Sequence, residues 1–198
     1  MKNQIKKEMV HHKVPNVKLY NCPVFNITTL DLTDCPLLET LICHSNPITY
    51  LDISLCPNIK YINCDNCQIT DLNIENNTAL ETLRCAGNQL HKLNVSHLSK
   101  LIEIDCTCNF LRELDLFYCV LLKRLYCPEN YLKYLNISEN LELKELHCYS
   151  NLLEELDISQ NTKLKKLLCY ENPFNNTIDY TNLETYRQYC LSIPPIMK

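Results

Sequence analysis

Apolar residues return along this chain at a constant interval of 21 positions. A cysteine marks each interval and defines position zero of the repeat: Cys22, Cys43, Cys64, Cys85, Cys106, Cys127, Cys148 and Cys169. Apolar side chains also recur two and five positions before the cysteine, and five, eight and ten positions after it, as in the segment 80–96, LETLRCAGNQLHKLNVS. A self-similar unit of this length indicates a stacked repeat architecture.

The two apolar positions at −2 and zero predict a short strand in every repeat. Residues two apart on a strand point to the same face, so both side chains enter the core. A single repeat cannot bury that face alone, and stacking of identical repeats places the strands in a parallel sheet. An asparagine follows at +3 in most repeats, where the chain leaves the strand. Its amide is expected to bond to backbone groups in the bend, each of which would cost about 1–3 kcal/mol if buried unpaired.

The complete unit, L-x-x-L-x-C-x-x-N-x-L, resembles the leucine-rich repeat. With cysteine in the third apolar slot, it is most similar to the 21-residue cysteine-ladder repeats of internalin J-like bacterial proteins. The resemblance covers about residues 17–178. It implies an α/β solenoid with short parallel strands stacked on a concave face and extended or 3-10 connectors on a convex face. It also implies an adhesin-like role at a bacterial surface as one function.

An open solenoid exposes its core at both ends, so caps are expected. Ile5, Met9 and Val10 are the predicted apolar contacts of the first cap, and a short helix over 182–191 is predicted for the second. That helix opens on a capping box, TNLE, and ends before Pro194. The predicted domains are an N-terminal cap with a degenerate first repeat (1–34), a solenoid of seven clear repeats (35–178) and a C-terminal cap (179–198).

The cysteines of the repeat are expected to be free and buried. Unpaired cysteine packs as a small hydrophobe, and an abundance of free thiols fits a reducing compartment. Cys64 and Cys67 have the spacing of a C-x-x-C metal knuckle, but no second pair completes four ligands, so no metal is predicted. Cys108, at +2, is the cysteine expected to be most exposed.

Composition narrows the function classes. The net charge of −4 argues against a broad nucleic-acid footprint, which needs a basic face. Gly87 is the single glycine, so neither a P-loop nor a nucleophile elbow can form. His147 and Cys148 are neighbours on a strand and point to opposite faces, which makes them a poor catalytic pair. No enzymatic activity and no cofactor are therefore predicted.

The chain contains neither an apolar run long enough to span a bilayer nor the apolar centre of a signal peptide. The expected location is the cytoplasm, or secretion without a conventional signal peptide, including delivery into a host cell. No membrane insertion is expected, and the chain alone is expected to be a monomer.

Columns of equivalent positions give the outward surface. The −3 column alternates in sign over Glu103, Arg124, Glu145 and Lys166, which favours mutual pairing across strands over a binding row. Aromatic and apolar residues gather towards the C-terminal repeats in the −1, +1 and +4 columns. Together with Arg124, they form the predicted partner-binding set: Phe110, Arg124, Tyr126, Tyr131, His147, Tyr149, Leu152, Leu168 and Tyr170.

Exposed aromatic clusters mark interaction sites, although tyrosines can also simply cover strand backbone. The predicted function is a non-enzymatic module that binds another protein through the concave face and adjoining rim, in one form as an inhibitor or regulator of that partner. An adhesin-like surface fragment and a bacterial effector acting on host proteins are the alternatives. Phe117, which replaces a serine in the connector, is either a convex contact or a local packing residue.

Overall fold

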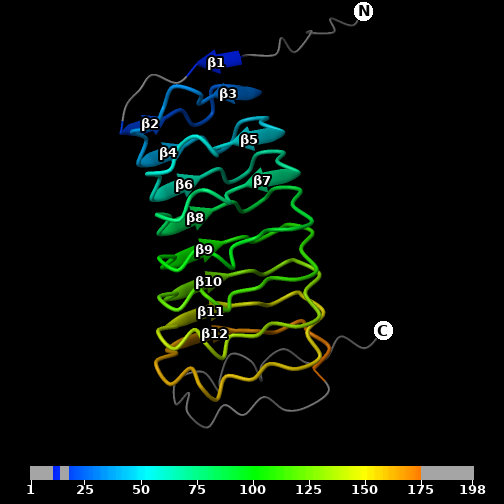
Figure 1. Cartoon of the computed structure of the whole chain (residues 1–198). Coiled ribbons are helices and arrows are strands. Elements are labelled where there is room, and N and C mark those ends of the chain that lie inside the picture. The colour runs from blue at the N-terminus through cyan, green and yellow to red at the C-terminus, as the bar shows by residue number, and fades with distance from the viewer. Residues whose placement is uncertain (1–10, 14–17, 175–198) are drawn as a thin grey trace, which may run out of the picture.

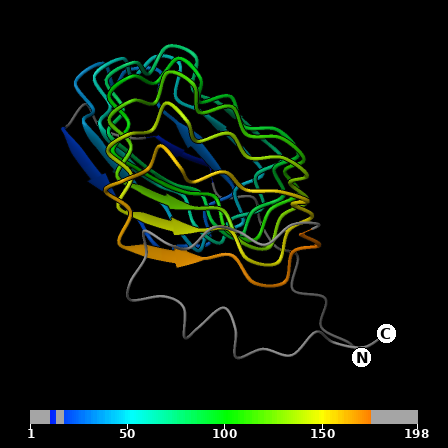
Figure 2. The same ribbon diagram turned by 90° about the horizontal axis from the view of Figure 1, so that it is seen from below.

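The computed structural model describes residues 11–13 and 18–174, and these form a stack of coils of 21 residues each (Figure 1). Viewed along the stack, successive coils follow almost the same path, with the strands of the main sheet on one side (Figure 2). The predicted solenoid is therefore confirmed. The apolar contacts predicted for the first cap and the helix predicted over 182–191 lie outside the described residues. The predicted domain boundaries remain predictions.

One parallel sheet of eight strands runs through the stack, in the order β12-β11-β10-β9-β8-β6-β4-β2. The pairing joins residues 21 apart, so that Leu125 on β10 faces Leu146 on β11 and Ile104 on β9. This is the register that the cysteine interval predicts. The strands are β2 (Leu19–Asn21), β4 (Thr40–Ile42), β6 (Tyr61–Asn63), β8 (Thr82–Arg84), β9 (Glu103–Asp105), β10 (Arg124–Tyr126), β11 (Glu145–His147) and β12 (Lys166–Leu168).

A second row of strands lies on the opposite side of the first coils only (Figure 1). Strand β1 (His11–Lys13) pairs with β3 (Thr29–Asp31), and β5 (Tyr50–Asp52) pairs with β7 (Asp71–Asn73), both in parallel. Later coils have no strand at these positions within the described chain. Hydrogen bonding between coils is thus continuous on one side of the stack and incomplete on the other.

The connectors consist of extended segments and pairs of tight turns. In one coil Cys56 N–H donates to Ile53 C=O at 3.0 Å and Ile59 N–H donates to Cys56 C=O at 3.2 Å. These bonds join residue i+3 to residue i, the pattern of a 3-10 helix, but neither an α-helix nor a 3-10 helix occurs among the residues that the structure describes. The α in the predicted α/β class therefore has no counterpart in this part of the chain.

The apolar ladder fills the interior, and all eight ladder cysteines are buried thiols that form no disulfide within the described chain, as predicted. The thiols also act as hydrogen-bond donors. The Sγ atoms of Cys64, Cys106 and Cys127 each lie 3.5 Å from the backbone oxygen twenty residues ahead, on the next strand. A leucine in this slot could not donate, which gives the cysteine a role beyond its small size.

The predicted asparagine ladder is confirmed. Asn109 shows the pattern: its Nδ2 donates to the backbone oxygens of Cys85, Cys106 and Thr107 at 3.0–3.2 Å, and its Oδ1 accepts from Leu90 N–H at 3.0 Å. One side chain thus satisfies four backbone groups of two coils. Cys67 interrupts this ladder, and its Sγ lies 3.5 Å from Cys43 C=O.

Candidate binding surface

The outward side chains of β8 to β12 and of the residue that follows each ladder cysteine form the strand face. Each of these strands has a half-buried, buried, half-buried pattern, because its central residue enters the core and its outer two lie on the surface. Hydrogen bonds hold the face in place, since every strand is bonded to both of its neighbours except at the ends of the sheet. The backbone that carries these side chains is therefore held in a fixed position.

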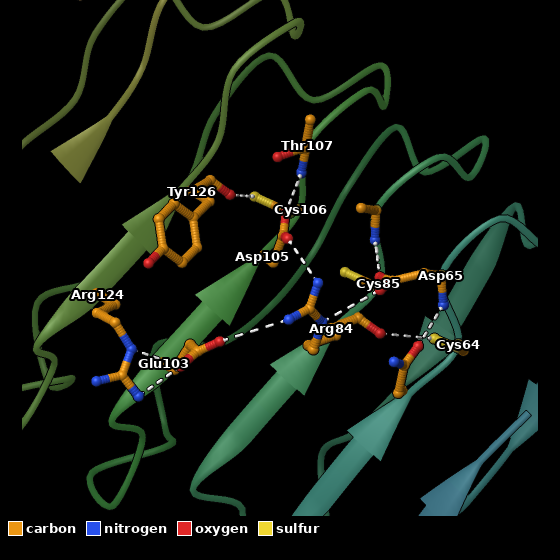
Figure 3. A network of polar contacts seen from close by, with 12 residues as sticks. Cys64, Asp65, Arg84, Cys85, Glu103, Asp105, Cys106, Thr107, Arg124 and Tyr126 are labelled. Carbon is orange, nitrogen blue, oxygen red and sulfur yellow. Dashed lines mark hydrogen bonds and ion pairs between the residues drawn. The ribbon is translucent and has the colours of Figure 1, made fainter. Parts of the chain in front are cut away.

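A network of charged side chains crosses the strand face (Figure 3). The Arg84 guanidinium lies 3.2 Å from Asp65, 3.5 Å from Asp105 and 3.9 Å from Glu103. Glu103 in turn accepts from Arg124 at 2.5 Å. Three carboxylates on two coils, those of β6 and β9, are thereby joined by two guanidinium groups from β8 and β10, and little unpaired charge remains in this part of the face.

Asp65 is the buried anchor of this network. Its Oδ1 accepts from Ala86 N–H at 2.7 Å and its Oδ2 faces Arg84. Burial raises the pKa of the Asp65 carboxyl, and these two partners oppose that rise by stabilising the charged form. Removal of Arg84 would leave a buried carboxylate with one backbone donor only.

A second cluster lies on β10 to β12. Glu145 accepts from Tyr126 Oη at 3.0 Å and from Lys166 Nζ at 2.5 Å, and it lies 2.9 Å from His147 Nε2. Burial raises the pKa of Tyr126 to about 12, and the hydrogen bond to Glu145 adds to the rise. Burial lowers the pKa of His147, helped by the positive charge of Lys166, so the imidazole is neutral at pH 7.

Aromatic pairs complete the face. The Tyr126 and His147 rings meet edge to face at a centroid distance of 4.9 Å. Tyr149 and Tyr170 are stacked at 4.6 Å, with 8° between their planes. Adjacent coils thus hold four predicted residues in two ring pairs, and Leu168 lies half-buried on β12 beside them.

The rim is the +4 column beside the strand face: Phe110, Tyr131 and Leu152. The three side chains are 40%, 47% and 41% exposed. The Phe110 and Tyr131 rings lie 6.2 Å apart and nearly parallel. A pocket of about 510 Å³ opens beside the rim and is lined by Arg112, Tyr131, Lys133 and Leu152.

The prediction for the −3 column is confirmed, since Glu103 pairs with Arg124 and Glu145 pairs with Lys166. The predicted residues fall into two sets, a half-buried set on the strand face and an exposed set on the rim. Their use by a partner remains a prediction. The sequence reasoning missed Arg84 and Asp65, although their positions in adjacent columns with opposite charge were a usable signal.

Phe117 is exposed on the connector side and meets Tyr118 edge to face at 4.9 Å. Within the described ranges, no three His, Cys, Asp or Glu side chains are grouped so that they could hold a metal. The same part of the chain has no helix of the length and apolarity that crossing a bilayer requires.

The sequence matches no protein-family model and no curated protein. Among solved structures, the functional domain of InlJ from Listeria monocytogenes, which includes a cysteine ladder, is 33% identical, with a TM-score of 0.68. The match covers 84% of this chain and 42% of that one. The chain is a leucine-rich repeat protein with a cysteine ladder.

Two further structures share the fold with this leucine-rich repeat chain. An internalin C2 from Listeria monocytogenes has a TM-score of 0.77 at 17% identity, over 84% of this chain and 76% of that one. YopM from Yersinia enterocolitica has a TM-score of 0.66 at 23% identity, over 78% and 33%. The chain spans less than half the length of the InlJ domain that it matches.

Proposed function

We propose that this chain is a non-enzymatic module that binds a protein partner through its strand face and rim. The observation that supports the proposal is the pair of stacked tyrosines, Tyr149 and Tyr170, beside the Tyr126–His147 pair on a rigid sheet. Tyrosine is enriched among binding hot spots, and a surface that is already ordered loses little entropy when it binds. In one form, the partner is an enzyme whose active site the module covers as an inhibitor or regulator.

The dimensions of the face suit a protein partner. Five strands from β8 to β12 at about 4.8 Å spacing extend the face by about 19 Å. With the rim, this can contribute to a standard interface of about 800 Å² on each side. The charged network of the face adds specificity more than affinity, because its charges are already paired.

A partner recovered from a native lysate and identified by mass spectrometry provides the ligand for the test. The variant Tyr149→Ala, Tyr170→Ala is expected to weaken its binding by about thirtyfold or more, since hot-spot truncations cost about 2 kcal/mol. Titration calorimetry measures the affinity, and circular dichroism checks the fold.

The matched control is Phe117→Ser, Tyr118→Ser, which removes two exposed aromatic rings from the connector side. It is expected to leave the affinity unchanged. Full affinity in the first variant, or an equal loss in the control, would exclude the strand face as the docking surface.

The similarity to InlJ over 42% of that protein's domain favours a second candidate, an adhesin-like part of a larger surface protein. Binding of the labelled module to intact host cells, measured by flow cytometry, tests this candidate. Loss of cell binding in the same tyrosine variant would assign the adhesive role to the strand face. The third candidate is an effector that acts on host proteins. It is distinguished from an adhesin by a partner protein that lies inside the host cell.

A further inference from the structure

The positive charges beside the rim differ from those of the strand face in having no partner. Arg84, Arg124 and Lys166 all form ion pairs on the strand face. Arg112 and Lys133 are exposed and, among the residues that the structure describes, neither has an acidic group within 4.0 Å. The strand face has largely neutralised itself, whereas the rim retains cations that can pair with an external anion.

These two cations line one pocket with two apolar side chains. The pocket has a volume of about 510 Å³, and its walls are Arg112, Tyr131, Lys133 and Leu152, with no acidic residue among them. Glu154 follows Lys133 in the same column of the next coil, which limits the cationic stretch to two coils. The pocket therefore offers an apolar floor next to two positive charges over a short distance.

The rim is held in a fixed position. Phe110, Tyr131 and Leu152 each donate a backbone N–H to the coil before them, at 2.8–2.9 Å. The next residue in each coil, such as Leu111, is fixed in turn by an asparagine side chain of the ladder. Because the backbone is already ordered, binding of a ligand here costs little conformational entropy.

The spacing of the rim rings suits an extended chain. The Phe110 and Tyr131 centroids are 6.2 Å apart, and side chains on one face of an extended strand repeat at about 6.8 Å. Alternate side chains of an extended segment can therefore contact successive rings. The intervening side chains point to the other face of the segment, so they meet the cations only where the long side chains of Arg112 and Lys133 extend past its edge.

We propose that the rim pocket binds an extended segment of the partner protein in which carboxylates flank apolar side chains. The apolar side chains pack on Tyr131 and Leu152, and the carboxylates pair with Arg112 and Lys133. This rests on the proposed function and specifies the partner's chemistry at one part of that surface. Single-stranded RNA, which also combines stacking with negative charge, is the competing ligand that the experiment excludes.

The probe is a fluorescein-labelled peptide, Ser-Glu-Phe-Asp-Leu-Glu-Ser, titrated with the full chain and followed by fluorescence anisotropy. Two matched peptides are tested with it: one with lysine at the three acidic positions, and one with serine at the two apolar positions. We expect the first peptide to bind at least about tenfold more tightly than either control, and we expect its affinity to fall as salt rises.

Variants then locate the site. Arg112→Glu, Lys133→Glu is expected to weaken the acidic peptide by about tenfold or more and to improve the lysine peptide. Tyr131→Ser should weaken the acidic peptide without changing its preference over the lysine peptide. Phe117→Ser, Tyr118→Ser on the connector side should leave peptide binding unchanged.

Three results would overturn the inference: equal binding of the lysine or serine peptide, no effect of the charge reversal, or tighter binding of a twelve-nucleotide oligouridylate through the same residues. If the peptide fails to bind while the strand-face variant still loses the native partner, the inference fails and the proposed function stands. If the peptide binds while the strand-face variant keeps the native partner, the strand-face part of the proposed function fails and the rim site stands.

Discussion

One backbone position, at +2 of the repeat, takes the left-handed conformation in every described coil. The residue at +2 has φ between 52° and 64° in every described coil, and its occupants are Val24, Ser45, Asn66, Gly87, Cys108, Glu129, Ser150 and Glu171. Gly87 is the only residue of this column without a Cβ, and left-handed backbone costs other residues about 1–2 kcal/mol. The bend after each strand is therefore locally strained in most coils.

Glu129→Gly is expected to stabilise the protein by about 0.5–1 kcal/mol, because relief of the left-handed strain exceeds the added entropy of the unfolded chain. The change in the free energy of unfolding is measured by urea denaturation. Glu155→Gly, on an exposed residue outside the left-handed set, is the control and should destabilise slightly. A loss of stability in Glu129→Gly equal to that of the control would contradict the strain argument.

The reverse change tests the same position. A Cβ on residue 87 would lie 2.5 Å from Asn66 Oδ1, so Gly87→Ala must displace that side chain in addition to straining the backbone. We expect a loss of about 1–3 kcal/mol in the free energy of unfolding. An unchanged unfolding midpoint would show that the column tolerates a side chain at no cost.

At the scale of the element, the asparagine ladder joins each bend to the coil before it. Asn109→Ala is expected to cost about 3 kcal/mol or more, because it leaves several buried backbone groups without a partner. Asn136→Ala, which removes only the surface bond that Ser138 N–H donates to Asn136 Oδ1, is the matched control with an expected cost below about 1 kcal/mol. Equal costs in the two variants would mean that the ladder adds nothing beyond an ordinary turn.

Cys67 allows the opposite test. Cys67→Asn introduces an amide where the ladder is interrupted, and its oxygen can accept from Ile48 N–H as the amides of other coils do. A gain of about 1 kcal/mol is expected in urea denaturation. A loss of stability would show that this coil has closed around the smaller thiol.

The sequence predicted the strands, their pairing and the ladder, because each depends only on which residue stands 21 positions away. It did not predict the thiol donors, the left-handed column or the Arg84 network, because these depend on side-chain reach and on the path of the bend. The second row of strands was missed for a related reason. The pattern at +7 to +9 differs little between coils, and pairing there depends on how closely the connector sides approach.

At the scale of the whole molecule, the buried column of sulfur atoms makes a prediction about reactivity. Burial raises the pKa of the thiols of Cys64, Cys85 and Cys127 well above the usual value, so they are neither ionised nor accessible. Cys108 is the one exposed cysteine in the described part of the chain.

In a Cys190→Ser background, Ellman's reagent is expected to modify about one thiol per chain rapidly under native conditions, and the rest only in denaturant. Adding Cys108→Ser should remove the rapid phase. Rapid modification of several thiols in that double variant would show that the coils open easily or that the column is exposed.

The lack of disulfides between the described coils has a consequence for how such a protein can evolve. No disulfide in the described chain ties one coil to another, and the backbone bonds along the main sheet recur from one inner coil to the next. Duplication of 21 codons would therefore add one more turn without disturbing its neighbours, and would lengthen the outer surface by about 4.8 Å. Reach and chemical character of that surface can thus evolve separately, the first by copying units and the second by point substitution.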